Sequence, residues 1–179
     1  MLVAVVTTTT LVACGDSSDG VESVILDEPG EYQQPTIALN DDLQGAPIET
    51  AVLLDADDQE VDLADLIGRP LVINFWFSAC PPCKREMPAL QTVSETYADT
   101  VQFIGVNSVD SRERMLDFAE EVGVTYELLR DPNSDLLVSN GIAAFPTTLF
   151  VDANGAVVKQ VAGEVTVESL TATIEELLK

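Results

Sequence analysis

Residues 71–83 read LVINFWFSACPPC, and this stretch decides the fold. Residues 71–77 are apolar apart from Asn74, which is typical of a central strand buried on both faces. Cys80 and Cys83 follow, separated by two residues, where a helix is expected to open. That spacing lets the two sulfurs meet within one turn, and the N-terminal end of a helix stabilises a thiolate. The stretch therefore predicts a strand, a reactive cysteine pair and a helix, in that order.

Composition narrows the possible functions. The chain has 179 residues and is 46% hydrophobic, which fits one globular domain with extensions. Its net charge is −23, from 31 acidic and 8 basic residues, so it lacks the basic footprint needed to bind nucleic acid or anionic lipid. There is no His, and one Cys-x-x-Cys pair supplies only two ligands, so no metal site is expected.

The chain before residue 47 is expected to lie outside the globular domain. Residues 1–13 are predicted to be a signal peptide, incomplete at its N-terminus because no Lys or Arg precedes the apolar run. Residues 11–15 read LVACG and resemble a bacterial lipobox, which makes Cys14 the expected lipidation site; the alternative is an ordinary Cys in an apolar segment. Residues 14–46 are predicted to be an acidic, flexible tether, in which residues 36–39 could add an edge strand.

Strand and helix patterns alternate over residues 47–179. Strands are expected at residues 51–54, 60–62, 71–77, 101–106, 126–129, 148–151 and 157–161. Helical segments are expected at residues 63–67, 82–98, 112–122, 135–139 and 167–178, with a kink at Pro88. The pattern predicts an α/β domain with a mixed central sheet, helices on both of its faces, and an N-terminal β-hairpin extension.

A family resemblance rests on three motifs. Residues 74–76 read NFW, residues 80–88 read CPPCKREMP and residues 145–152 read FPTTLFVD. Together they resemble the TlpA/ResA branch of the thioredoxin superfamily, over about residues 45–179. The resemblance implies a thioredoxin-like fold and a membrane-tethered, extracytoplasmic thiol-disulfide oxidoreductase that needs no cofactor. One departure is Ala79, where relatives often carry an aromatic residue.

Each residue of the cysteine motif has an expected role. Cys80 is expected to be an exposed attacking nucleophile, and Cys83 a buried resolving thiol, joined to it as a reversible disulfide. The alternative is a structural disulfide or an idle pair of core thiols. Glu86 shares a helix face with Cys83 and is expected to relay its proton, as the resemblance supports. The alternative for Glu86 is a solvated carboxylate in the first helical turn. Asn74 stands where thioredoxin has a buried acid.

A second segment is expected to bind the substrate. By resemblance, Pro146 is a cis-proline beside the disulfide and exposes a backbone edge to an extended substrate segment. Phe145 and Thr147 would border that edge. The alternative is a trans-proline that only starts a strand. The expected substrate-binding face is completed by residues near the cysteines: Pro81 and Pro82, which fix the turn, and Trp76, which supports the loop from the core.

The resemblance implies that this protein carries out thiol-disulfide exchange with other proteins outside the cytoplasm. The expected direction is reduction, in which this protein delivers electrons to client disulfides. Apocytochrome c is the family's best-known client, a membrane carrier of the CcdA/DsbD type would supply electrons, and a lipid on Cys14 would anchor the protein to the membrane. Four alternatives stay open: an oxidant that introduces disulfides, a peroxiredoxin, a copper chaperone and a non-catalytic binding domain. The paired cysteines argue against a peroxiredoxin, and the lack of His argues against a copper chaperone.

Overall fold

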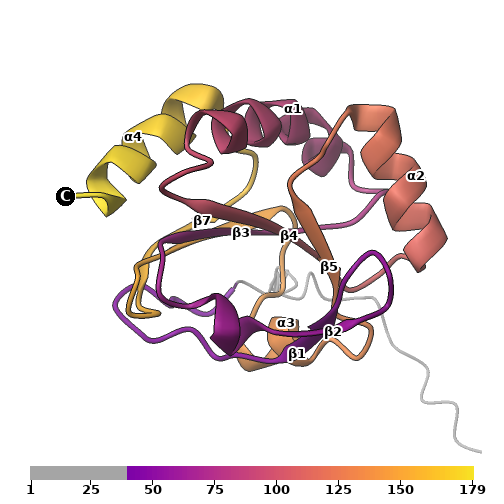
Figure 1. Ribbon diagram of the computed structural model, residues 1–179, viewed down its shortest axis with the longest axis horizontal. Coiled ribbons are helices and arrows are strands. Elements are labelled where there is room, and N and C mark those ends of the chain that lie inside the picture. Colours follow the sequence, from indigo (N-terminus) through magenta and orange to yellow (C-terminus); the bar gives the residue numbers. More distant parts are fainter. Residues whose placement is uncertain (1–39) are drawn as a thin grey trace, which may run out of the picture. The chain divides into compact units, whose positions relative to one another are not determined.

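A seven-stranded sheet is the centre of residues 40–179, which are the residues that this computed structural model describes (Figure 1). The strand order across the sheet is β2-β1-β5-β4-β3-β6-β7. The strands are β1 (Val52–Leu54), β2 (Glu60–Asp62), β3 (Leu71–Trp76), β4 (Gln102–Asn107), β5 (Glu127–Arg130), β6 (Thr147–Val151) and β7 (Val157–Ala162). All seven coincide with predicted strands to within one residue at either end.

The sheet is mixed, as the sequence predicts. Strands β3, β4 and β5 run parallel, and β3 pairs with β4 from Leu71 opposite Gln102 to Trp76 opposite Asn107. Strand β6 runs antiparallel to β3, and β7 returns antiparallel to β6. The β1–β2 hairpin joins the other side, antiparallel to β5. This confirms the mixed sheet and the N-terminal hairpin extension.

Helices cover both faces of the sheet, but unequally. The helices α1 (Pro81–Thr96), α2 (Arg112–Val122) and α4 (Val167–Leu177) lie on one face (Figure 1). The other face carries the 3-10 helix η1 (Leu63–Leu66) and the short helix α3 (Asp135–Ser139). The two layers leave β3 buried at all six positions, which is why its sequence reads as a nearly continuous apolar run.

Alternate residues of β3 divide the core between the two faces. Leu71, Ile73 and Phe75 belong to one cluster, which packs under η1 and α3. Val72 and Trp76 belong to the clusters beneath α1, α2 and α4. Because side chains alternate along a strand, this register fixes which residues at the end of β3 face helix α1. Asn74 therefore points to the same side as Trp76.

The structure extends the folded part of the chain toward the N-terminus. The expected start of the domain at residue 47 falls inside a segment, residues 40–48, that is hydrogen bonded to the sheet and its loops. Gly45 N donates to Val157 O, and Val157 N donates back to Ala46 O, so the segment pairs with the start of β7. The predicted signal peptide, Cys14 and the possible strand at residues 36–39 lie outside the described residues.

Two further findings apply to residues 40–179 alone. Their helices are all too short or too polar to cross a bilayer. Their His, Cys, Asp and Glu side chains include no group of three or more arranged to hold a metal ion.

Candidate active site

The cysteine pair lies at the junction of β3 and α1. Cys80 is the N-cap of α1, and its Sγ accepts a hydrogen bond from Cys83 N at 3.2 Å. Pro81 and Pro82 fill the first helical turn, where a residue without an N–H leaves no helical bond unmade. Cys80 and Cys83 are joined as a disulfide with an S–S distance of 2.02 Å. The structure therefore confirms the predicted pairing and places it at the N-terminal end of the helix dipole.

The expected exposure of Cys80 is not observed. In this disulfide form Cys80 is only 3% exposed and Cys83 is fully buried. Both sulfurs belong to a cluster between α1 and α2 that includes Trp76, Met115 and Phe118, and this packing covers them. The prediction of an exposed Cys80 is wrong for the oxidised protein, whereas the prediction of a buried Cys83 is confirmed. What accessibility remains lies on Cys80.

The loop before Cys80 is tied to the loop after β4. Ser78 donates from its N–H and its hydroxyl to the two carboxylate oxygens of Asp110, at 2.7 and 2.8 Å. Asn107 Nδ2 donates to the same carboxylate at 2.7 Å, and Arg114 Nε donates to Ser78 Oγ at 3.0 Å. These bonds fix the turn that delivers Cys80. The sequence analysis missed Asp110, because its partner lies 32 residues away in the chain.

Glu86 is buried rather than solvated. Its side chain is 1% exposed, Oε1 accepts from Asn74 Nδ2 at 2.8 Å, and Oε2 accepts from Val165 N at 3.0 Å. Burial raises the pKa of the Glu86 carboxyl to about 7; the hydrogen bonds from Val165 and Asn74 oppose that rise, and the charge of Glu164 adds to it. This finding contradicts the alternative of a solvated carboxylate. Both oxygens are hydrogen bonded to partners other than Cys83.

A set of buried polar atoms lies on the same face of the sheet. Asn74 Nδ2 also donates to Thr148 Oγ1 at 3.0 Å. Three buried polar atoms of this set have no hydrogen-bond partner among residues 40–179: Asn74 Oδ1, Trp76 Nε1 and the Tyr126 hydroxyl. A Cβ on Gly105 would lie 2.9 Å from Trp76 Nε1 and 3.2 Å from a ring carbon of Tyr126, so the glycine makes room for both rings. Burial, and then the charge of Glu86, raises the pKa of Tyr126 well above its usual range.

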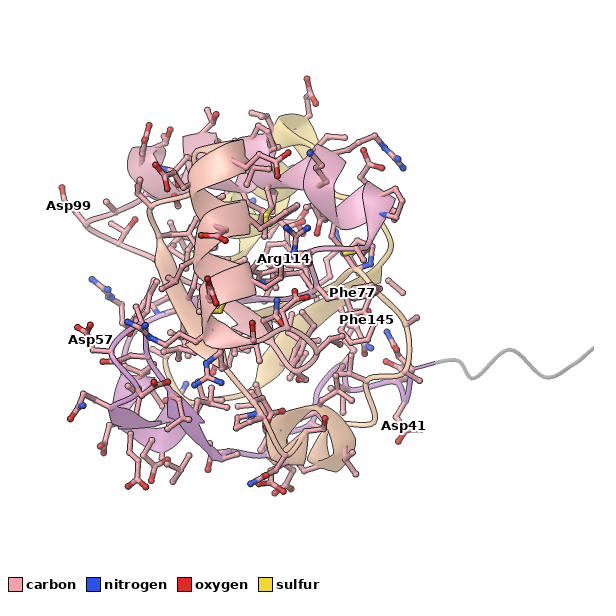
Figure 2. All side chains as sticks on the ribbon, turned by 90° about the vertical axis from the view of Figure 1, so that its right-hand side faces the viewer. Asp41, Asp57, Phe77, Asp99, Arg114 and Phe145 are labelled. Carbon is pink, nitrogen blue, oxygen red and sulfur yellow. A yellow bond between two sulfur atoms is a disulfide. The ribbon has the colours of Figure 1, made fainter. Side chains whose placement is uncertain are left out.

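The predicted cis-proline is present. The Phe145–Pro146 peptide bond is cis, and Pro146 O accepts from Gly163 N at 2.8 Å. Phe145 packs against the cluster that contains both cysteines, and its ring meets Phe77 edge-on with centroids 5.3 Å apart. Figure 2 shows Phe77, Phe145 and Arg114 on the same side of the molecule. The structure thus places Phe145, the residue before the cis-proline, against the cluster that contains the disulfide.

Two residues expected at the substrate face point into the protein. Trp76 is fully buried and stacks on Phe118 with ring centroids 5.3 Å apart, in keeping with a supporting role. Thr147 is also fully buried, and its hydroxyl donates to Ala144 O and accepts from Asn40 Nδ2. Its side chain therefore holds the loop and does not border an open edge. No sequence pattern connects Asn40 with this loop, because residue 40 fell within the predicted tether.

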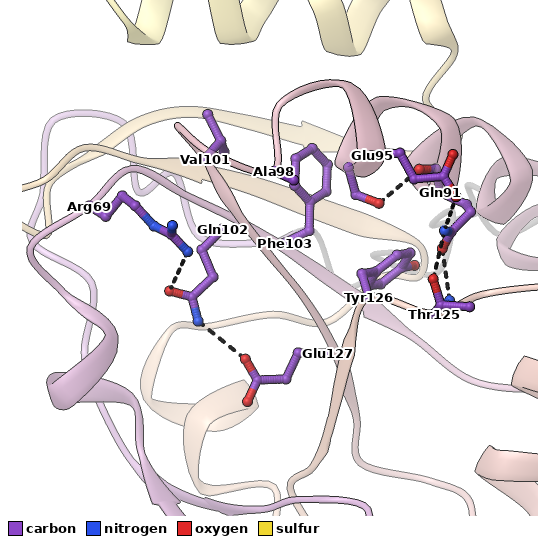
Figure 3. Close-up of a pocket in the computed structure, with 11 residues that line it drawn as sticks. Arg69, Gln91, Glu95, Ala98, Val101, Gln102, Phe103, Thr125, Tyr126 and Glu127 are labelled. Atoms are coloured by element: carbon purple, nitrogen blue, oxygen red, sulfur yellow. Dashed lines mark hydrogen bonds between the residues drawn. The ribbon is translucent and has the colours of Figure 1, made fainter.

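The pocket drawn in Figure 3 is not the redox site. It has a volume of about 350 Å³ and lies between the second half of α1 and the strands β4 and β5. The side chains that line this pocket are hydrogen bonded to one another. The bonds run from Arg69 to Gln102, from Gln102 to Glu127 and from Gln91 to Thr125. No cysteine lines it. The Cys80–Cys83 disulfide therefore lies outside this pocket.

Comparison with known proteins agrees with this geometry. The Redoxin family model matches residues 43–178. The chain belongs to the Redoxin family. Thiol-disulfide oxidoreductase ResA of Geobacillus thermodenitrificans is 31% identical to this redoxin over 134 residues, which cover 74% of this chain and 77% of that protein. ResA of Bacillus subtilis is 29% identical over 137 residues, covering 76% of each chain.

Solved structures agree on the fold of this redoxin. A thiol:disulfide interchange protein of the thioredoxin family from Chlorobium tepidum TLS has a TM-score of 0.67 at 22% identity, with 78% of this chain and 100% of that chain covered. The fold is thus thioredoxin-like. With its Cys80–Cys83 disulfide and its ResA relatives, the redoxin is a thiol-disulfide oxidoreductase.

Proposed function

We propose that this redoxin reduces disulfides of proteins outside the cytoplasm. The observation that carries the proposal is the position of the cysteine pair, because Cys80 is the N-cap of α1, where the helix dipole stabilises its thiolate, while Cys83 lies inside the helix. In the reduced protein, the Cys80 thiolate attacks one sulfur of the client disulfide and releases the other as a thiolate. Cys83 then attacks Cys80, which frees the second client thiolate and closes the Cys80–Cys83 disulfide. Two electrons pass from the redoxin to the client.

Glu86 supplies the proton handling in this scheme. Cys83 must lose a proton before it can attack the mixed disulfide, and its burial opposes that loss. A carboxyl with a pKa of about 7, one helical turn from Cys83, is suited to accept the proton near neutral pH. In the oxidised form this carboxylate is bonded to Asn74 and Val165, so it would act on reduction, once the Cys83 thiol exists.

The loop of residues 143–147 would bind the client. Phe145 and Phe77 form a partly buried apolar rim against the cluster that contains the disulfide, and would contact the incoming client chain. Pro81, exposed, and Pro82, half-buried, flank the disulfide at the start of α1. Pro146 would present the backbone edge to which an extended client segment pairs. Thr147 contributes by holding this edge in place from inside.

The position in the cell is part of the same proposal. A lipid on Cys14 would anchor the redoxin to the outer face of the cell membrane, and the acidic residues that follow would form the tether. A membrane carrier of the CcdA/DsbD type would regenerate the dithiol, and apocytochrome c is the client that the resemblance suggests. Support for these points is the LVACG motif and the similarity to ResA proteins.

The midpoint potential of the Cys80–Cys83 pair tests the direction of transfer. It is measured by equilibrating the purified protein in graded thiol buffers. We expect a value near that of thioredoxin, about −270 mV, as a reductant requires. A value near that of DsbA, about −120 mV, would instead make the protein an oxidant and would exclude the cytochrome c assignment.

The division of roles between the cysteines has its own test. Cys83→Ser should accumulate a mixed disulfide between Cys80 and a client peptide, because the thiol that resolves it is gone. Cys80→Ser should accumulate none, since Cys83 lies inside α1 rather than at its N-cap and is fully buried. The adducts are counted by intact-protein mass spectrometry without reductant. Equal trapping by both variants would contradict the assignment.

A further inference from the structure

Asn40 is bonded to the loop that presents Pro146 through three hydrogen bonds. Its Oδ1 accepts from Ala143 N at 2.7 Å and from Ala144 N at 2.8 Å. Its Nδ2 donates to Thr147 Oγ1 at 2.7 Å. The amide therefore touches both ends of the residue 143–147 loop. These partners lie 103 to 107 residues away in the chain, so the contact is tertiary.

The loop has few other restraints of this kind. Within the described residues, the hydrogen bonds of residues 143–147 apart from sheet pairing include Thr147 Oγ1 to Ala144 O and Gly163 N to Pro146 O. The first of these depends on the same hydroxyl that Asn40 Nδ2 holds. Asn40 thus orients the backbone N–H groups of Ala143 and Ala144 at the start of the loop. It also orients the Thr147 hydroxyl at the end of the loop.

We infer that Asn40 is a positioning residue for client binding: it holds the residue 143–147 loop in the shape that receives the client backbone. The inference rests on the proposed function, in which that loop contacts the client. A client segment that pairs with the loop must find Phe145 and Pro146 already ordered, since ordering them on binding would weaken the complex. Asn40 touches neither sulfur, so its effect should fall on binding and not on electron transfer.

Hydrogen bonds of the neighbouring residues hold Asn40 in place. Asp41 N donates to Gly141 O at 3.1 Å, and Leu43 N donates to Gln160 Oε1 at 3.1 Å. Gly141 has a φ of +57° and lies under the Asp41 side chain, which leaves no space for a Cβ. The segment that follows Asn40 is therefore held at two further points, and the positive φ and the close Asp41 side chain favour glycine at residue 141.

The test compares variants of the full chain in single turnover. Each protein is pre-reduced and mixed with increasing concentrations of a synthetic peptide closed by one disulfide; the fit gives a half-saturating concentration and a maximal rate. Asn40→Ala removes all three hydrogen bonds, and we expect the half-saturating concentration to rise about tenfold with the maximal rate within about twofold. Asn40→Asp keeps an acceptor for both amides but loses the donor to Thr147, so a rise of about threefold is expected.

Three controls separate the possible outcomes. Asp42→Asn alters an exposed neighbour whose hydrogen-bond partner within residues 40–179 is Gln44 N, and should leave both parameters unchanged. Bis(hydroxyethyl) disulfide is too small to use the loop, so its rate should match that of the unmodified protein in all Asn40 variants. The Cys80–Cys83 midpoint potential should also be unchanged. A parallel loss with the small disulfide would assign Asn40 a purely structural role and overturn the inference.

A further variant distinguishes this inference from the proposed function on which it rests. Phe145→Ala should raise the half-saturating concentration if the loop binds clients at all. If Phe145→Ala raises it while Asn40→Ala leaves it within about twofold, the loop assignment stands and the role of Asn40 is refuted. If the unmodified protein does not saturate, or Phe145→Ala has no effect, the loop assignment itself fails.

Discussion

Single residues decide the chemistry of this site, and Glu86 shows how burial tunes one of them. The carboxyl lies beneath α1, bonded to Asn74 and Val165, in surroundings that favour its neutral form. Because its pKa lies well above the usual value of 4.5, the folded protein holds this proton more tightly than the unfolded chain does. The contribution of Glu86 to stability is therefore greatest in acid and is lost as the pH rises through about 7.

Glu86→Gln should change how stability depends on pH. The glutamine cannot ionise, so the difference in unfolding free energy between this variant and the unmodified protein should shift by about 3 kcal/mol in favour of the variant from about pH 4.5 to about pH 8. Urea unfolding of the oxidised proteins at both pH values measures it. Glu175→Gln, on the exposed side of α4, should follow the unmodified protein. A constant difference between Glu86→Gln and the unmodified protein would contradict the raised pKa.

At the scale of elements, the site depends on loops joined across the end of the sheet. The β3–α1 loop carries Ser78 and the β4–α2 loop carries Asp110, and the carboxylate holds both the backbone and the hydroxyl of Ser78. Asn107 Oδ1 in turn accepts from Val109 N and Asp110 N, which orders the second loop. The position of Cys80 therefore depends on an acidic residue of a neighbouring β–α unit.

Asp110→Ala should destabilise the protein by about 2 kcal/mol, since it leaves the Ser78 N–H and hydroxyl in a nearly buried position without their acceptor. Urea unfolding at neutral pH measures the loss. The matched control is Asp99→Ala, which alters an exposed turn after α1 and should cost less than about 0.5 kcal/mol. Equal unfolding midpoints for the two variants would show that the hydrogen bonds of Asp110 make no net contribution to the free energy of unfolding.

The elements themselves could be read from the sequence, while the links between them could not. The apolar run of β3, the Cys-Pro-Pro-Cys start of α1 and the Asp152–Gly155 turn before β7 are local signals, and each predicted the right structure. Asp110 and Asn40 carry no local signal, because their partners are distant in the chain. Cys80 was misjudged for a related reason: the cluster in which it is buried includes α2 side chains, which come from a different part of the sequence.

The whole molecule carries a large excess of negative charge. With 31 acidic and 8 basic residues, repulsion between carboxylates opposes the compact state. Most of the observed ion pairs, such as Arg85 with Glu164 and Lys84 with Glu121, lie at the surface and contribute little. Net repulsion should therefore outweigh pairwise attraction in the folded protein.

Added salt should then stabilise this protein. Raising KCl from about 0.05 M to about 1 M shortens the screening length from roughly 14 Å to about 3 Å, and should raise the thermal unfolding midpoint by about 5 °C. Calorimetry of the oxidised protein measures the midpoint. An equal osmolality of a neutral sugar controls for non-ionic effects of the solute. A midpoint that falls as KCl is added would mean that surface ion pairs outweigh the repulsion.

The two edge strands of the sheet decide how readily two molecules of this protein can pair through their sheets. One border is β2, which is only three residues long and carries Glu60 and Asp62 on its exposed positions. The other is β7, whose first residue already pairs with the chain at Gly45 and Ala46. A short, charged border and one that is covered at its first residue give an incoming strand less to pair with, and this is how β-proteins avoid forming fibres. At high protein concentration, we therefore expect this protein to resist aggregation by pairing between the edge strands of neighbouring molecules.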